Sequence, residues 1–421
     1  MLNEIAGQGG NAGNGRGARV LIYSHDTFGL GHLRRALTLA HSLVESHKNL
    51  SVLILSGSPI IGSFDFRARV DFVRVPGVIK LRNGEYTALN LLIDLDETLS
   101  IRTSIIKHTA AIFDPDVFIV DKEPSGLRGE VLPTLKMLKK RGTRLVLGLR
   151  DVLDEPALLV PEWKRKKVLP ALKNLYDDIW VYGLPQICEP LAELELPESV
   201  LKKVTYTGYL PRCVPTTPNP SPPPEITKNP YLLVTTGGGG DGEGLIEWVL
   251  RAYETDPMLP YPALLVLGPF MQSDKQAEFL NRASSLERVE AITFDQHMES
   301  LEDNAVGIVA MGGYNTFCEI LSLDKKAIIV PRKVPRLEQF IRASRAETLG
   351  LIRMLEDDGN YDPAVMADAL RQMPRQGKPS DVVVPGLLEG LVNVGRLIEP
   401  FLDRHAEKPE VERPTVLANR V

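Results

Sequence analysis

The sequence has few cysteines, no basic excess and no long apolar run, and each absence narrows the possible functions. Its three cysteines, Cys188, Cys213 and Cys318, are scattered and odd in number. They indicate neither a disulfide framework nor a metal site, as fits a reducing compartment. The net charge of −5 argues against a nucleic-acid partner, because proteins that bind phosphate backbones usually carry excess positive charge. No run of about 18 apolar residues occurs, so we expect no transmembrane span and leave peripheral membrane contact open.

What is present is the composition of a globular protein, with 43% hydrophobic and 24% charged residues in 421. Such a chain can bury a large core, and its length predicts two or three domains. Residues 1–17 are rich in glycine, asparagine and alanine, which predicts a disordered tail and not a secretory signal. Residues 404–421 predict a second, polar tail. We therefore expect the protein in the cytoplasm or at the inner face of the membrane.

Short apolar runs alternate with helical patterns through the first half of the chain. Strands are expected at 19–24, 51–56, 70–75, 117–121, 144–149, 178–182 and 203–207, and helices at 31–47, 90–113, 127–141, 165–175 and 185–194. This alternation is typical of βαβ units on a parallel sheet that is buried on both faces. It predicts a doubly wound, Rossmann-like α/β domain over residues 18–210.

A proline-dense stretch then interrupts the alternation. Residues 211–230, "PRCVPTTPNPSPPPEITKNP", can continue neither a helix nor a central strand. We interpret them as a semi-rigid linker at a domain boundary, with a proline-rich partner motif as the alternative.

The alternation restarts after the linker. Strands are expected at 231–236, 263–268, 289–294, 306–311 and 326–331, and helices near 275–284, 297–303, 315–322 and 336–348. Residues 231–380 therefore predict a second doubly wound domain. The amphipathic stretch at 384–403 predicts a last helix, and we expect segment 381–403 to pack back on the first domain. Two such domains in series imply a cleft where the carboxyl ends of their strands face each other, and open α/β sheets bind ligands at those ends.

The first candidate site is "RVLIYSHDTFGLGHLRRALTLA", at residues 19–40. Gly29 and Gly31 permit a tight turn and a close ligand approach between the strand and the helix. The helix that begins near His32 directs its free N–H groups toward the cleft, where a diphosphate can bind. His32 suits a general base, although a histidine that only caps the loop is the alternative. The loop lacks the third glycine and the acidic partner of a dinucleotide fingerprint.

The second candidate site is a run of four glycines directly after a strand, Gly237, Gly238, Gly239 and Gly240. Their backbone N–H groups can surround a phosphate, and a flexible turn is the alternative. The loop lacks the Gly-Lys-Ser/Thr ending of a P-loop, which disfavours ATP hydrolysis.

Two further candidate sites follow strands of the second half. Gly312 and Gly313 end a strand, and Asn315 or Thr316 is expected as the N-cap of the next helix. Glu319, one turn into that helix, can hold both hydroxyls of a ribose. Further on, Glu338 and Gln339 open a helix and can bond sugar hydroxyls. Solvated helix faces are the alternative for both carboxylates.

Strand ends of the first half add candidates for the acceptor side of the cleft. Asp121 ends the strand at 117–121 and can orient His32 as the acid of a dyad, unless it only caps a loop. Arg150 and Asp151 end the next strand and can contact an acceptor, as can Glu123. His25, on the glycine loop, is an alternative base.

Together these four stretches resemble the GT-B superfamily of nucleotide-sugar glycosyltransferases, in particular its MurG-like branch. The resemblance covers roughly residues 19–375. The first loop, with Gly29, Gly31 and His32, is similar to the Gly-x-Gly-His-x-x-Arg loop of proteins described as predicted glycosyltransferases. Gly313, Thr316 and Glu319 are similar to the stretch whose glutamate binds ribose, and Glu338 and Gln339 to the helix start that reads the donor sugar. The family's usual Gly-Gly before Gly-His is absent here, and Arg34 and Arg35 replace small or proline residues.

The resemblance implies a metal-independent transferase without a cofactor, which moves a hexose or N-acetylhexosamine from a UDP-sugar to a hydroxyl acceptor. His32 would be the general base. No Asp-x-Asp motif of metal-dependent transferases follows a strand, since "DLDE" at 94–97 falls in a helical pattern. The acceptor can be a sugar, a lipid-linked or a small molecule, and a role in cell-envelope polysaccharide is expected. The loop "GLGHLRR" is also similar to that of a nucleotide-sugar hydrolase, so hydrolysis stays an alternative, together with 2-epimerisation and non-catalytic binding.

Overall fold

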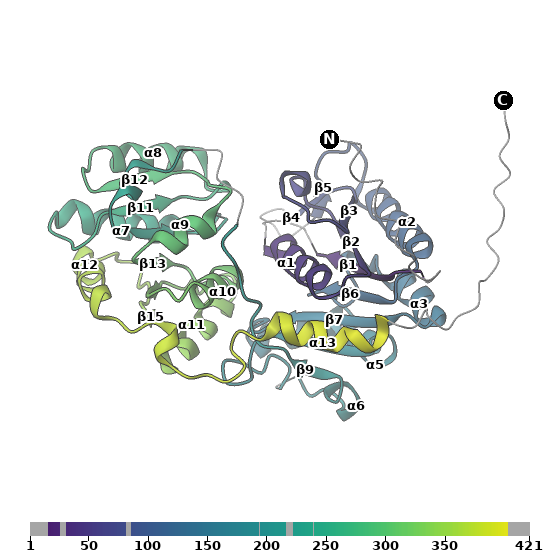
Figure 1. The fold of residues 1–421 in the computed structure, drawn as a ribbon. Coiled ribbons are helices and arrows are strands. Elements are labelled where there is room, and N and C mark those ends of the chain that lie inside the picture. The colour runs from purple at the N-terminus through teal and green to yellow at the C-terminus, as the bar shows by residue number, and fades with distance from the viewer. Residues whose placement is uncertain are drawn as a thin grey trace, which may run out of the picture.

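Two parallel β-sheets organise the chain (Figure 1). The structure is a computed structural model, and it describes residues 16–25, 31–80, 86–192, 194–215, 222–238 and 240–402. The predicted features that lie outside these residues are positions 1–15 of the first tail, Gly29, residues 216–221 of the linker, Gly239 and the tail at 404–421. The two sheets and the helices on them give the α/β, doubly wound fold that the alternation predicts.

The first sheet has the strand order β3-β2-β1-β6-β7-β8-β9. Its strands are β1 (Ala18–Ser24), β2 (Leu50–Ser56), β3 (Val70–Arg74), β6 (Val117–Asp121), β7 (Arg144–Arg150), β8 (Asp178–Tyr182) and β9 (Val204–Tyr206). The helices of this half are α1 (Gly31–Ser46), α2 (Leu95–Phe113), α3 (Leu132–Arg141), α4 (Pro156–Arg165), α5 (Val168–Asn174) and α6 (Glu198–Leu201). A small hairpin pairs β4 (Val78–Lys80) with β5 (Tyr86–Ala88).

The second sheet has the order β12-β11-β10-β13-β14-β15. Its strands are β10 (Leu232–Thr235), β11 (Ala263–Val266), β12 (Val289–Ile292), β13 (Gly307–Ala310), β14 (Ala327–Ile329) and β15 (Arg353–Met354). Its helices are α7 (Glu243–Thr255), α8 (Ser273–Ser284), α9 (Met298–Asn304), α10 (Tyr314–Ser322), α11 (Glu338–Thr348) and α12 (Pro363–Gln372). Each sheet reverses its strand order once, between β1 and β6 in the first and between β10 and β13 in the second. Ligands of open α/β sheets bind at the carboxyl ends of the strands beside such a reversal.

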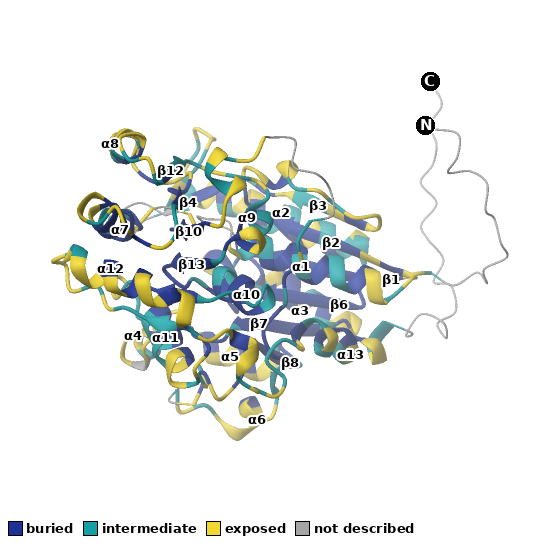
Figure 2. Cartoon of the chain, turned by 60° about the vertical axis from the view of Figure 1, so that its left-hand side comes forward, coloured by how far each residue is buried: buried dark blue, intermediate teal, exposed yellow. Residues whose placement is uncertain are grey.

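Burial explains why the strands read as apolar runs. All five residues of β6 and all four of β10 and β13 are buried, because helices cover both faces of each sheet. Figure 2 shows β6 and β7 in the colour of buried residues inside a shell of partly exposed helices. No helix within the described residues is long and apolar enough to cross a bilayer.

The last described helix, α13 (Gly390–Leu402), returns to the first half of the molecule, where Figure 1 shows it in yellow below β7. It contacts α1 and β6. Asn393 donates from Nδ2 to the carbonyl of Thr207 at 2.9 Å, and the Gly390 N–H donates to the carbonyl of Tyr209 at 3.1 Å. The chain therefore crosses between the halves twice, once near residues 211–230 and once before α13.

Replacement by alanine should have opposite effects on stability at two glycines of α13. A Cβ at Gly390 would lie 2.4 Å from the carbonyl oxygen of Tyr209, whereas a Cβ at Gly395 would lie 3.8 Å from Nε2 of His47. We expect Gly390→Ala to lower the free energy of unfolding by about 1–3 kcal/mol through overpacking. Gly395→Ala, the control, should raise it by about 0.5–1 kcal/mol, because alanine is the better helix former. Denaturant melts of both variants measure this, and equal effects would contradict the close docking of α13.

Several predicted helices need correction. The helix expected at 185–194 is wrong, since the described residues there form turns and Pro185 and Pro190 interrupt any helix. The helix expected at 90–113 begins only at Leu95, where the Asp94 side chain accepts from the N–H of Glu97 at 2.7 Å. The helix expected at 127–141 is interrupted near Arg128, whose φ is +49°. The proline-containing helices α4 and α12 were not predicted.

Candidate functional site

Residues from both halves meet where the two strand-order reversals face each other. Asn315, in the first turn of α10, donates from Nδ2 to the carbonyl of Gly31 at the start of α1, at 3.2 Å. Arg150, at the end of β7, donates to Glu338 at the start of α11, at 2.6 Å. The structure thus brings the predicted acceptor side and donor side into direct contact.

His32 and Asp121 form the dyad that their strand-end positions predict. Nδ1 of His32 lies 2.5 Å from Oδ2 of Asp121, although the residues are 89 positions apart in the chain. Asp121 is only 5% exposed. Because the carboxylate accepts the hydrogen bond, the ring carries its proton on Nδ1, which leaves Nε2 as a proton acceptor.

Arg35 completes this site. It is the arginine of the Gly-x-Gly-His-x-x-Arg loop, but no role was predicted for it. It donates from Nε to Oδ1 of Asp121 at 2.8 Å and from Nη2 to both carboxylate oxygens at 2.6 and 2.8 Å. Its side chain is 2% exposed, and it lies three residues after His32 on the same helix face. Its place in that loop motif, together with its charge on an otherwise apolar helix face, was the available signal.

The protonation states follow from burial and these neighbours. Burial lowers the pKa of His32 to about 4, although the Asp121 carboxylate opposes the shift. Burial alone would raise the pKa of Asp121, but the charges of Arg35 and His32 outweigh it and hold that pKa well below its usual range. At neutral pH the dyad is therefore a neutral imidazole held by an ionised carboxylate.

His25 lies next to His32, and the two rings are in contact. Its ring meets the His32 ring edge-on at 5.9 Å between centroids, and its Nδ1 lies 3.4 Å from the hydroxyl of Tyr23. Tyr23 in turn donates to Glu130 at 2.5 Å, and Arg102 holds that carboxylate at 2.6 Å. Because His25 is buried and this network supports it, its position favours a structural role over that of the alternative base.

The loop between β13 and α10 forms the opposite wall. Gly312 has φ +76°, and a Cβ there would lie 2.6 Å from Cγ2 of Ile329, so only glycine fits. Gly313, and not Asn315 or Thr316, occupies the N-cap of α10, and no side chain caps this end. Asn315 bonds across the interface instead, where its Oδ1 accepts from Arg212 at 2.8 Å. Thr316 lies in the first turn of α10 and is partly buried.

Glu319 is not a solvated helix residue. It is 1% exposed, and its Oε1 lies 2.7 Å from Nη2 of Arg34, which reaches across from α1. Arg34 also pairs with Glu299. Burial, and then the charge of Glu319, raise the pKa of the neighbouring Glu302 well above its usual range. The predicted ribose ligand thus has a cation of the other half as its partner.

The glycine loop after β10 is described at Gly237, Gly238 and Gly240. Gly237 has φ +67°, which favours glycine. The carbonyl of Gly238 accepts from the N–H of Phe270 at 2.9 Å, and a Cβ at Gly238 would lie 3.2 Å from the Phe270 ring. The loop therefore packs closely against the segment after β11 at Gly238, whereas a Cβ at Gly237 would meet nothing within 4 Å.

Glu338 and Gln339 are buried in the first turn of α11 and do not form a solvated face. Arg332 donates its N–H to Oε1 of Gln339 at 3.1 Å and from Nη2 to Glu338 at 3.4 Å. Burial opposes ionisation of Glu338, but the charges of Arg150 and its neighbours outweigh it and lower the pKa to about 2.

Asp151 does not face an acceptor, contrary to the expectation from its strand-end position. It is 0% exposed, Arg342 of α11 holds both its oxygens at 2.7 Å, and Tyr209 donates to Oδ2 at 2.7 Å. Arg342 joins this carboxylate to the second half, whereas Tyr209 belongs to the same half as Asp151. Glu123 is likewise engaged, by Lys166 at 2.6 Å.

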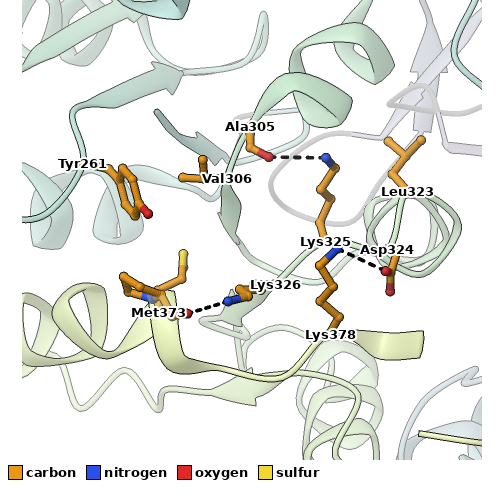
Figure 3. A pocket seen from close by; sticks show the side chains of 10 residues that line it. Tyr261, Ala305, Val306, Leu323, Asp324, Lys325, Lys326, Met373 and Lys378 are labelled. Atoms are coloured by element: carbon orange, nitrogen blue, oxygen red, sulfur yellow. Dashed lines mark hydrogen bonds and ion pairs between the residues drawn. The ribbon is translucent and has the colours of Figure 1, made fainter. Parts of the chain in front are cut away.

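A cavity of about 310 Å³ lies at the opposite ends of the strands in the second half (Figure 3). Tyr261, Val306 and Lys326, which precede β11, β13 and β14, line it together with Met373 and Lys378. None of the predicted site residues lines this cavity, so it has no part in the candidate site.

The comparisons with known proteins agree with this geometry. Residues 233–373 match the glycosyltransferase family 28 C-terminal domain. That segment carries the glycine loop, the start of α10 and the start of α11. Comparison with curated protein sequences gave no match.

Solved structures share the fold across nearly the whole chain. Phytolacca americana UGT2, complexed with UDP-2-fluoro-glucose and pterostilbene, is 12% identical with a TM-score of 0.62, over 91% of this chain and 99% of that one. Acinetobacter baumannii MurG is 14% identical with a TM-score of 0.55, over 91% and 99%. A putative UDP-N-acetylglucosamine 2-epimerase from Listeria monocytogenes is 11% identical with a TM-score of 0.58, over 95% and 100%. The domain match and the shared fold support a glycosyltransferase enzyme of GT-B architecture.

Proposed function

We propose that this protein transfers a hexose or N-acetylhexosamine from a UDP-sugar to a hydroxyl acceptor, with His32 as general base and without a metal ion. The observation that carries the proposal is the buried dyad of His32 and Asp121 at one strand-order reversal, opposite the uncapped start of α10 at the other. The Gly-x-Gly-His-x-x-Arg loop further suggests the MurG-like branch.

The first half would activate the acceptor. Nε2 of His32 takes the proton of the acceptor hydroxyl as its oxygen bonds to the anomeric carbon of the sugar. Asp121 keeps the Nδ1 proton in place and stabilises the imidazolium that forms. A neutral ring is required for this step, and burial provides it by lowering the pKa of His32.

The second half would hold the donor. The bond between the anomeric carbon and the diphosphate breaks, and the diphosphate leaves with the electron pair. Backbone N–H groups of the glycine loop and of the α10 start would stabilise that charge. Each such preorganised donor contributes about 3–4 kcal/mol to the transition state, so no metal is needed. Arg34 would be the partner of Glu319 while no nucleotide is bound, and ribose hydroxyls would replace it when the donor binds.

Calorimetric titration with UDP in the presence of a chelator tests the donor site. We expect a Kd in the micromolar range, about −8 kcal/mol. Glu319→Gln should weaken it by about 10-fold or more, because a charged hydrogen bond to the ribose is lost. Glu356→Gln, which changes an exposed carboxylate of the same half, is the control and should leave the Kd unchanged.

No binding of UDP, GDP or dTDP at millimolar concentration would overturn the proposal. Incubation with UDP-sugars then separates transfer from the hydrolase alternative. Release of UDP at about 1 s⁻¹ or faster without any acceptor would favour hydrolysis, in which water takes the acceptor's place at His32.

A further inference from the structure

Three cations surround one carboxylate where the two halves meet. Glu338 accepts from Arg150 of the first half at 2.6 and 3.3 Å and from Arg332 of the second half at 3.4 Å. The charge of Lys122, which directly follows β6, also acts on Glu338. We call Lys122, Arg150 and Arg332 the cation cluster.

The cation cluster has donor groups to spare. The Nε atoms of Arg150 and Arg332 are buried and have no hydrogen-bond partner among the described residues. The terminal nitrogens of Arg150 hold Glu338, and those of Arg332 hold Glu338 and Asp241. The ammonium of Lys122 makes no hydrogen bond or ion pair within the part of the chain that the structure describes. Buried donors are nearly always paired, so free ones at a site indicate an absent acceptor.

The neighbouring charged groups are engaged in pairs. Arg342 holds Asp151, Arg336 holds Asp154 and Glu162, and Lys166 holds Glu123. Glu338 and Asp241 are held by the arginines of the cluster, so Lys122 is the cation of the cluster without an ion pair among the described residues. Burial, and then the charge of Arg150, lower the pKa of Lys122 to about 8, although the carboxylates of Glu338 and Glu123 oppose the shift.

Lys122 lies next to the dyad along the chain. It follows Asp121 directly and has a left-handed backbone with φ +64°. Strained non-glycine backbone of this kind concentrates at functional sites. The charge of Lys122 acts on His25 and on His32, so its ammonium lies within electrostatic reach of both rings.

We propose that the cation cluster binds an anionic group, a carboxylate or a phosphate, carried by the transferred sugar or by the acceptor. The assignment of the carrier rests on the proposed function, whereas the anion site itself rests on the cluster alone. The cluster accordingly selects a charged sugar, such as a uronic acid, or an acceptor with a phosphate or carboxylate beside its reactive hydroxyl.

Calorimetry on the wild type and on Lys122→Met tests this directly. The first titrant is inorganic phosphate on the unliganded protein, and the variant should bind it at least 10-fold more weakly. Next, UDP-glucuronate is compared with UDP-glucose, and then glucuronate and glucose 6-phosphate are titrated into UDP-loaded protein. Lys122→Arg should restore binding, and Lys140→Met, on the exposed face of α3, is the control. Thermal melts establish that each variant is folded.

If the transferred sugar carries the anionic group, UDP-glucuronate should bind at least 10-fold more tightly than UDP-glucose, and Lys122→Met should abolish the difference. If the acceptor carries the anionic group, the two UDP-sugars should bind equally well. Glucuronate or glucose 6-phosphate should then bind in a way that depends on Lys122. Two results would overturn the proposal. The first is equal affinity of wild type and Lys122→Met for phosphate. The second is an affinity of Lys122→Met for UDP alone that is reduced as much as its affinity for phosphate, which would assign the cluster to the diphosphate. If UDP fails to bind, the phosphate titration still decides the anion site while the proposed function falls.

Discussion

Replacement of His32 by alanine should lower turnover by about 10²–10⁴-fold and leave the Kd for UDP nearly unchanged. The ring is the group whose Nε2 is free to take a proton, since Nδ1 donates to Asp121 at 2.5 Å. The predicted nucleotide contacts lie on the other half, in the glycine loop and α10, so the substitution should not reach them. Initial rates with a UDP-sugar and calorimetry with UDP measure the two effects separately.

His41 provides the control for that experiment. It lies on the same helix as His32, is partly buried, and its Nε2 has no hydrogen-bond partner among the described residues. His41→Ala should therefore keep both turnover and affinity. A His32→Ala variant with normal turnover but a large loss of UDP affinity would assign His32 to nucleotide binding and refute its role as a base.

The dyad also sets the expected pH dependence. Because burial lowers the pKa of His32 to about 4, the ring stays neutral throughout the physiological range. Turnover should hold as the pH falls from 7 to about 5 and drop as it approaches 4, where the ring becomes protonated. An acid limb near pH 6.5, the value of an ordinary histidine, would mean that the base is a solvated group and not His32.

The parts of this structure that depend on local pattern could be predicted from sequence. Alternating apolar runs and helical patterns predicted the parallel sheets, because buried parallel strands need covering helices. The pairing of His32 with Asp121 followed from their shared location at the carboxyl ends of strands. Such reasoning places a residue at an edge, and it does not say where its side chain points. Asp151 shows the difference, since it ends the neighbouring strand region and yet turns to Arg342 in the interior.

Features that depend on how the two halves meet could not be predicted. Glu319 and Glu338 looked like solvated carboxylates when considered alone. Their partners, Arg34 and Arg150, belong to the other half and lie 285 and 188 positions away. Nothing in a local pattern encodes such pairs. The role of Arg35 could not be predicted for a related reason, because neither its place in the loop motif nor its charge on an apolar helix face reveals the buried carboxylate beside it.

Arg35 therefore provides the second large prediction. Arg35→Met should lower the free energy of unfolding at pH 7 by about 3–5 kcal/mol, because it leaves the Asp121 carboxylate buried without its cation. In the wild type the depressed pKa of Asp121 keeps this group's contribution constant from pH 7 down to about 5, and the contribution falls as the pH drops further. In the variant that pKa rises, so protonation relieves the unpaired charge and the loss should shrink as the pH falls toward 4. Denaturant melts at several pH values measure it, and a loss independent of pH would indicate a packing defect.

The double variant Arg35→Met/Asp121→Asn separates charge balance from chemistry. Removal of both charges should recover much of the stability, since neither ion is then buried alone. Turnover should stay low, because an asparagine amide can neither stabilise the imidazolium nor hold His32 in the tautomer with a free Nε2. Recovery of both properties together would show that Asp121 serves only to neutralise Arg35. Stability without activity would instead show that the Asp121 carboxylate itself acts on the reaction through His32, beyond its pairing with Arg35.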